Sequence, residues 1–168
     1  MPPKIWTSME IRQATDSDLE GIWSLFCAVR SSGELRYSNK ISREAFSAQW
    51  LNEDLQTYVA EELPHLLGVY KLGVNFPGIN SHVATASFLV HTEVRDRGVG
   101  RALVQHAISR AQDAGYLQMQ FNYVPSDNLP AITLYTELGF SIIETLDKAF
   151  TDSSGKLRDA YVLQRFLQ

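Results

Sequence analysis

Arg95-Asp96-Arg97-Gly98-Val99-Gly100-Arg101 is the stretch of sequence that decides the fold. It lies between an apolar run, residues 84–90, and a segment with helical periodicity that lasts until Gly115. The sequence therefore predicts a strand, a glycine-rich turn and the start of a helix. The first backbone N–H groups of a helix have no partner within the helix, and the helix dipole favours anions there. Because Gly98 and Gly100 lack a Cβ, the chain can turn tightly and a phosphate can approach the backbone.

The charge of this turn predicts that it holds a pyrophosphate group. Arg97 and Arg101 place two guanidinium groups at the same point, and guanidinium groups bind phosphate strongly. The turn is not a Walker loop, because no Gly-Lys-Ser/Thr follows, and it lacks the third glycine of the dinucleotide-binding fingerprint. The alternative interpretation is an ordinary strand–helix turn with exposed arginines.

A second motif lies downstream of this turn. Residues 128–140 read Asn-Leu-Pro-Ala-Ile-Thr-Leu-Tyr-Thr-Glu-Leu-Gly-Phe, which resembles the Asn-x-x-Ala-x-x-Leu-Tyr-x-x-x-Gly-Phe helix of the GCN5-related N-acetyltransferases (GNAT). Residues 95–101 resemble the Arg/Gln-x-x-Gly-x-Gly/Ala segment with which this family cradles the pyrophosphate of acetyl-CoA. The resemblance covers Ser81 to Phe140, about a third of the chain. It implies an α/β (α+β) fold with a central mixed, mostly antiparallel sheet and helices on both faces.

Composition bounds the class of protein. A chain of 168 residues suits one domain with one sizeable core, so we expect a single N-acetyltransferase domain over residues 1–168. The net charge of −4 argues against general nucleic-acid binding. The single cysteine, Cys27, excludes an internal disulfide and a cysteine-rich zinc site, and its apolar neighbours predict a buried core thiol. No apolar run reaches membrane length, so we expect no membrane association and a cytoplasmic location, with the nucleus left open.

Hydrophobic periodicity and turn residues predict the order of the elements. Helices are expected over about 16–30, from Ser42 to about residue 51, over 98–114, and from about Asn128 to Gly139. Strands are expected over 9–13, 56–61, 66–72, 82–90, 117–124, 140–146 and 158–166. The strand over 82–90 is nearly continuously apolar, which predicts burial on both faces. Its small side chains leave room for a ligand, and in the resembling family that ligand is the pantetheine arm.

The resemblance implies a set of residues that bind acetyl-CoA as cosubstrate, with no metal. In the family, a bulge splays the central strand from the next one, so we expect Leu89 and Val90 to offer unpaired backbone groups. The N–H of Val90 would face the thioester oxygen. The alternative is a fully paired strand. Asn128 suits a helix cap, and in the family an asparagine here also reaches the cofactor. The expected donor-binding residues are Phe88, Leu89, Val90, Arg95, Arg97, Gly98, Val99, Gly100, Arg101, Ala102 and Asn128.

Tyr135 is the expected catalytic residue. A thiol has a pKa of about 8.5 and a phenol one of about 10, so a tyrosine can hydrogen-bond an emerging thiolate and give it a proton. The position of Tyr135, directly after Leu134 and four residues before Gly139, matches the family's general acid. The alternative is a packing tyrosine, because Tyr135 also lies at core spacing.

The sequence does not single out a general base. Many members of the family have a glutamate on the central strand, but this chain has Ala84 and Thr85 there. His82 and His91 flank the strand, although either suits a surface or capping role. Glu61 and Glu62 could act through water, or the amine could lose its proton to solvent before it binds.

Asn122 is expected to position the acceptor. Phe121-Asn122 followed by Ser126-Asp127-Asn128 resembles the Phe-Asn…Thr-Asn pattern of a fungal branch of the family that acetylates proline analogues such as azetidine-2-carboxylate. Thr85 departs from that branch, in which an asparagine stands nearby. His82 and Thr85 complete the expected acceptor site. The alternative for Asn122 is a polar residue on the solvent face of its strand.

Together these residues predict an N-acetyltransferase that moves an acetyl group from acetyl-CoA to the amine of a small molecule, such as an amino or imino acid, through a ternary complex. A protein N-terminal or lysine acetyltransferase would share the donor site. A non-catalytic CoA-binding sensor would keep the cradle without needing Tyr135. The expected partner is thus a small amine, and a homodimer is left open.

Overall fold

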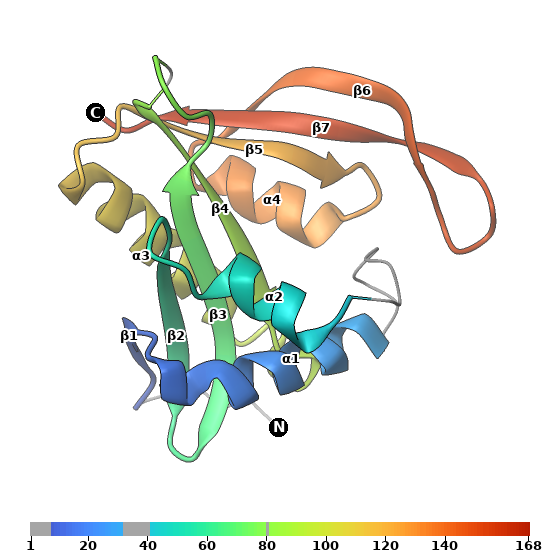
Figure 1. Ribbon diagram of the computed structural model, residues 1–168. Helices are drawn as coiled ribbons and strands as arrows, with labels where there is room; N and C mark the ends of the chain where they lie inside the picture. The colour runs from blue at the N-terminus through green and yellow to red at the C-terminus, as the bar shows by residue number, and fades with distance from the viewer. Residues whose placement is uncertain (1–7, 32–40, 80) are drawn as a thin grey trace. The chain divides into compact units, whose positions relative to one another are not determined.

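The computed structural model describes residues 8–31, 41–79 and 81–168 (Figure 1). Its chain divides into two compact units. The first unit consists of residues 1–73 and 87–107, and the second of residues 74–86 and 108–168. Within the described residues no helix is long and apolar enough to cross a membrane.

The strands form one mixed sheet. Seven strands of the described residues lie in the order β1-β2-β3-β4-β5-β7-β6. All the recorded pairings are antiparallel except β4 with β5, which are parallel through Val83↔Gln118 and Ala84↔Met119. The strands are β1 (Glu10–Gln13), β2 (Gln56–Glu62), β3 (His65–Val74), β4 (Val83–Val90), β5 (Gln118–Pro125), β6 (Ser141–Thr151) and β7 (Leu157–Phe166). This confirms the predicted α/β class with a mixed, mostly antiparallel sheet.

The described residues contain four α-helices. They are α1 (Leu19–Ser31), α2 (Arg43–Trp50), α3 (Val99–Asp113) and α4 (Leu129–Glu137). Ser42 caps α2 by accepting a hydrogen bond from the N–H of Ala45 at 3.1 Å, as expected for a serine at this position. A short 3-10 turn, Asp16–Asp18, precedes α1 and replaces the first turn of the predicted helix.

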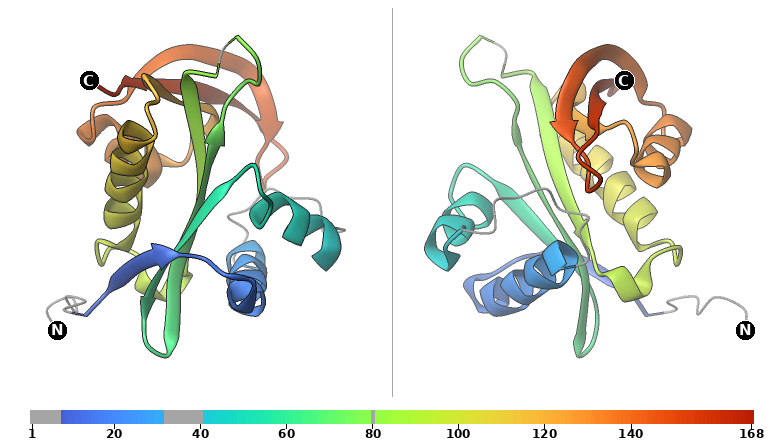
Figure 2. Two further views of the ribbon diagram at one scale, coloured as in Figure 1. Left: turned by 60° about the vertical axis from the view of Figure 1, so that its left-hand side comes forward. Right: turned by 90° about the vertical axis from the view of Figure 1, so that its right-hand side faces the viewer.

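In the first unit, helices cover both faces of the strand pair β2–β3 (Figure 2). Successive residues of a strand point to opposite faces. On one face, Val59 and Val69 pack in a core with the apolar sides of α1 and α2, centred on Phe26, Phe46 and Trp50. Cys27 borders this core and is half-buried, so the expectation of a buried thiol was wrong: Cys27 lies at the margin of the core.

The other face of β3 packs against α3. Gly68 lies so close to this helix that a Cβ there would be 2.8 Å from Cδ1 of Leu103 and 3.5 Å from Cγ1 of Val99. Val99 and Leu103 are almost completely buried, and they belong to the predicted apolar stripe of the helix, which also contains Ala107. The first turns of α3 therefore rest directly on the backbone of β3.

The second unit is built on β5, β7 and β6 with α4. Phe121 of β5 stacks on Phe140 with ring centroids 4.6 Å apart, and Gly139 ends α4 with a positive φ of 90°. No residue of α4 is fully buried, so the predicted apolar face of this helix is only half-buried. β6 is longer than predicted, and most of its residues are exposed because it lies at the edge of the sheet.

The burial of β4 differs from the prediction. Val83, Ala84 and Leu89 are buried, whereas Ser87 in the middle of the strand is exposed. The continuous apolar run therefore does not mean burial on both faces along the whole strand. Short side chains such as Ala86 and Ser87 need little cover, and solvent reaches this part of the strand.

A cluster of charges in the first unit makes a testable contribution to stability. Arg12 donates two hydrogen bonds of 2.8 Å to the carboxylate of Asp18 and two of 2.9 and 3.0 Å to that of Glu61. Asp18 also accepts from the N–H of Thr15 at 2.8 Å. Its side chain is only 11% exposed. The hydrogen bonds from Arg12, the largest cause, lower the pKa of Asp18 from 3.8 to about 2.

We expect Asp18→Asn to lower the free energy of unfolding at pH 7 by about 1–2 kcal/mol, since a depressed carboxyl pKa stabilises the folded state above the pKa of the unfolded chain. That contribution is lost as the pH falls through about 2. The free energies of unfolding of wild type and Asp18→Asn should therefore converge between pH 4 and pH 2. Urea unfolding across this range measures it. Asp16→Asn, in the same turn and exposed, is the control. A difference that stays constant with pH would contradict the assignment.

Candidate functional site

The predicted strand–turn–helix is present in the first unit. After β4 ends at Val90, a short 3-10 turn over Thr92–Val94 leads into the segment Arg95–Gly98. The N–H of His91 donates to the carbonyl of Leu67 at 2.9 Å, which ties the end of β4 to β3. Two residues of the turn have left-handed backbone, Asp96 with φ of 59° and Gly98 with φ of 83°. The reversal therefore depends on this conformation at Gly98, directly before α3 begins at Val99.

The start of α3 is open and positively charged. The N–H of Ala102 donates to the carbonyl of Gly98 at 3.0 Å, which is the first turn of the helix. Gly98 is exposed, and beyond its chain neighbours no atom lies within 4 Å of the point that its Cβ would occupy. Arg97 and Arg101 are exposed at the same turn. A helix N-terminus with open space, glycine and two guanidinium groups suits a diphosphate.

The other predicted donor-binding residues of the turn are partly covered. Val99 is buried, so only its backbone remains for a ligand, and Gly100 and Ala102 are half-buried. Arg95 is half-buried too; burial lowers its pKa, while the neighbouring charge of Asp96 raises it. The surface that the turn presents therefore consists of backbone and of the two exposed arginines.

The predicted pantetheine-binding part of β4 lies in the same unit. The ring of Phe88 packs against Tyr70 with centroids 5.6 Å apart. Leu89 is buried and its carbonyl oxygen lies 3.0 Å from where a Cβ of Gly68 would be. Val90 is half-buried. That the backbone groups of Leu89 and Val90 are available to a ligand stays a prediction.

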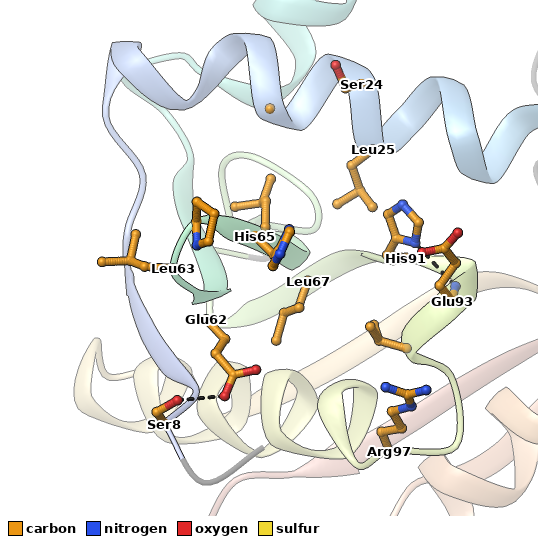
Figure 3. Close-up of a pocket in the computed structure, with 14 residues that line it drawn as sticks. Ser8, Ser24, Leu25, Glu62, Leu63, His65, Leu67, His91, Glu93 and Arg97 are labelled. Carbon is orange, nitrogen blue, oxygen red and sulfur yellow. Dashed lines mark hydrogen bonds between the residues drawn. The ribbon is translucent and has the colours of Figure 1, made fainter. Parts of the chain in front are cut away.

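A groove of about 870 Å³ runs beside the turn in the first unit (Figure 3). This volume is enough for a small molecule. Leu25 of α1 and Leu67 of β3 line it with apolar side chains, and Val94 and Arg97, from the segment before α3, line it as well. Its other lining residues are Ser8, Gly21, Ser24, Glu62, Leu63, Pro64, His65, Leu66, His91 and Glu93.

The four residues considered as general base have different contacts, although Glu62 and His91 both line this groove. Nδ1 of His91 accepts from the N–H of Glu93 at 3.2 Å, so this histidine caps the short turn. Glu62 accepts from the hydroxyl of Ser8 at 2.6 Å. Glu61 accepts two hydrogen bonds from Arg12, as described above. His82, in the second unit, is exposed before β4.

Tyr135 lies on α4 in the second unit. Its ring packs against Phe121 with centroids 4.6 Å apart and against Phe140 at 5.8 Å. Burial raises the pKa of Tyr135 to about 12. The phenol is therefore protonated at neutral pH, as a hydrogen-bond donor must be. Asn128 begins the same helix, and its side-chain oxygen accepts from the N–H of Ala131 at 3.4 Å; its capping role is thus seen, and its cofactor contact stays a prediction.

Asn122 is exposed on β5 and pairs with a residue that the sequence analysis missed. Its amide nitrogen donates to Oδ1 of Asn75 at 2.5 Å, and Nδ2 of Asn75 donates back at 3.2 Å. Gln120 also donates to Asn122, at 2.9 Å. Asn75 follows β3 in a loop, and no motif marks it. An exposed Asn122 agrees with the alternative interpretation, in which it is a polar residue on the solvent face of its strand. Acceptor binding by Asn122, His82 and the half-buried Thr85 stays a prediction.

Comparison with known proteins identifies the family. The sequence profile of the acetyltransferase (GNAT) family matches residues 19–140. The chain belongs to the acetyltransferase (GNAT) family. The match includes the turn at Gly98 and the helix with Tyr135, and this family consists of acyl-CoA-dependent N-acetyltransferases. Within the described residues no group of three or more histidine, cysteine or acidic side chains could hold a metal ion.

Individual similar proteins agree with this family assignment. N-acetyltransferase aca1 of Schizosaccharomyces pombe is 31% identical over 117 residues, which are 66% of this chain and 54% of that protein. The match thus spans about half of the yeast relative. A GCN5-related N-acetyltransferase from Kribbella flavida is 34% identical, with a TM-score of 0.89 over 95% of this chain and 98% of its own. The structure of yncA from Salmonella typhimurium, solved with its cofactor acetyl-CoA, shares the fold with a TM-score of 0.82 at 22% identity, over 96% of this chain and 95% of its own.

Proposed function

We propose that this GNAT protein transfers an acetyl group from acetyl-CoA to the amine of a small molecule. The observation that carries the proposal is the turn before α3, where Gly98 has a φ of 83° and open space beside its Cα. Arg97 and Arg101 flank that space. A diphosphate there would meet backbone N–H groups, the helix dipole and two guanidinium groups. The acetyl-CoA complex of the yncA structure supports the same donor for this chain.

The proposed reaction is direct transfer within a ternary complex. The neutral amine attacks the thioester carbonyl carbon and forms the new C–N bond, and the C–S bond then breaks. The backbone N–H of Val90 would stabilise the oxygen as it becomes negative. Tyr135 would hydrogen-bond the departing sulfur and give it the phenolic proton, and the phenol would then regain a proton from solvent. The proton lost by the amine passes to solvent, because none of the four candidate bases is singled out by its surroundings.

The acceptor in this proposal is a small amino or imino acid, and the whole chain, residues 1–168, acts as one domain. Asn122, His82 and Thr85 remain its proposed contacts. A homodimer is compatible with the exposed edge strand β6 but is not required by the mechanism. Acetylation of a protein N-terminus or lysine would use the same donor site and differ only in the acceptor.

A free-thiol assay with an amine panel tests the proposed function. The panel contains proline analogues, amino acids, simple amines and a lysine peptide, each with acetyl-CoA. We expect thiol release with small amino or imino acids and none without an amine. Release only with the peptide would replace the small acceptor by a protein. Donor binding without thiol release in the presence of any amine would favour the non-catalytic sensor over the enzyme.

A further inference from the structure

We propose that Tyr70 and His106 form a positioning pair that fixes α3, and with it the diphosphate-binding turn, against the sheet. The hydroxyl of Tyr70 on β3 lies 2.7 Å from Nδ1 of His106 on α3, a hydrogen-bond distance. Both residues belong to the first unit. The inference rests on the proposed function, because the turn at Gly98 is the donor site there.

Aromatic rings of neighbouring strands pack against the pair. Tyr70 is completely buried. Tyr58 of β2 stacks on Tyr70 with centroids 5.2 Å apart and meets the edge of His106 at 4.9 Å. Phe88 of β4 lies 5.6 Å from the Tyr70 ring. Because residues of three strands hold the Tyr70 ring in place, its hydroxyl stays in one position relative to α3.

The same strand also fixes how deep α3 lies. Gly68 and Tyr70 are two residues apart and so point to the same face of β3. The absent side chain of Gly68 lets Val99 and Leu103 approach the backbone, whereas a Cβ would come within 2.8 Å of Leu103. Gly68 therefore sets the distance between helix and strand. The hydrogen bond of Tyr70 sets the rotation of the helix about its own axis.

If α3 rotates about its axis at His106, the turn before the helix moves as well, because a helix moves as a rigid body. His106 lies seven residues after Val99, which is about two turns or about 10 Å along the axis, and on the same face of the helix. The N–H groups that would bind the diphosphate belong to the first turn of this helix. Mispositioning a binding group by about 1 Å is enough to weaken it strongly. Loss of the Tyr70–His106 bond is thus expected to act on donor affinity.

Tyr70→Phe keeps the ring and removes only the hydroxyl. We expect its dissociation constant for CoA, measured by calorimetry, to rise about three- to tenfold, the range that one hydrogen bond supports. We also expect a higher KM for acetyl-CoA with nearly unchanged kcat at saturating donor. Tyr123→Phe, which loses the 2.9 Å bond to the carbonyl of Ala149 in the second unit, is the matched control and should keep wild-type affinity.

Substitutions of His106 separate positioning from helix stability. Asn carries an oxygen close to where Nδ1 lies, so His106→Asn should retain most of the donor affinity. His106→Leu should lose it, although leucine is the better helix former. If Leu bound CoA as well as Asn did, the hydrogen bond would have no positioning role and the proposal would be overturned.

A truncated donor tests whether the pair acts through the turn. S-acetylpantetheine lacks the diphosphate and the nucleotide, so wild type and Tyr70→Phe should use it equally well. Equal losses with both donors would overturn the assignment to the turn. If wild type bound no CoA, the proposed function itself would fail. If wild type bound it and Tyr70→Phe bound equally well, only this inference would fail.

Discussion

Gly98→Val is expected to weaken acetyl-CoA binding at least tenfold while the protein stays folded. Glycine adopts a φ of 83°, as at Gly98, without strain. Such a conformation costs other residues about 1–2 kcal/mol, and it costs β-branched residues more. Relief of this strain would turn the first N–H groups of α3 away from the diphosphate. The new side chain would also occupy the open space beside Gly98. Isothermal titration with acetyl-CoA measures the change in affinity.

The chain offers a matched control for Gly98→Val. Gly155, in the hairpin between β6 and β7, has φ of 84° and likewise has no atom beyond its chain neighbours within 4 Å of its Cβ position. Gly155→Val should therefore carry a similar backbone strain and a similar loss of thermal stability, but unchanged donor affinity. Wild-type affinity in Gly98→Val, or an equal loss in both variants, would show that the turn does not bind the donor.

Tyr135→Phe is expected to slow acetyl transfer about tenfold or more, with donor affinity nearly unchanged. General acid catalysis typically contributes about 10²–10⁴-fold. The lower part of this range is more consistent with Tyr135, because burial raises its pKa to about 12, well above the value of about 8.5 for a thiol. A phenol with this pKa hydrogen-bonds the emerging thiolate before it gives up its proton. Single-turnover rates at saturating acetyl-CoA measure the effect.

The pH dependence gives a second test of the same role. A phenol with a pKa of about 12 stays protonated across the neutral and mildly alkaline range. Loss of its proton should therefore not lower the rate below about pH 11. Tyr116→Phe, at a half-buried tyrosine outside α4, controls for the general effect of removing a hydroxyl. A transfer rate in Tyr135→Phe equal to wild type would refute the assignment of the acid.

The turn and the order of elements could be predicted because their signals are local. Glycine at positive φ, capping serine and asparagine, and apolar residues at helical spacing all act within a few residues of one another. Gly98, Ser42 and Asn128 therefore mark helix starts in the sequence, and the structure has helices at these positions. The sheet class followed from the family resemblance together with these elements.

The parts that could not be predicted depend on residues far apart in the sequence. Tyr70 and His106 are 36 residues apart, and Asn75 and Asn122 are 47 apart. No periodicity or motif connects such pairs, because each residue alone looks like an ordinary strand, helix or loop residue. The exposure of Ser87 was missed for a related reason: an apolar neighbourhood along the chain does not show which side of a strand is covered.

Calorimetric titration of the wild-type protein with acetyl-CoA tests the central claim most directly. We predict saturable binding in the micromolar range at one site per chain. The binding should weaken when salt screens Arg97 and Arg101. It should also weaken at least tenfold in Gly98→Val but stay unchanged in Gly155→Val. No binding by the folded wild-type protein would contradict the claim that the turn before α3 is a donor site.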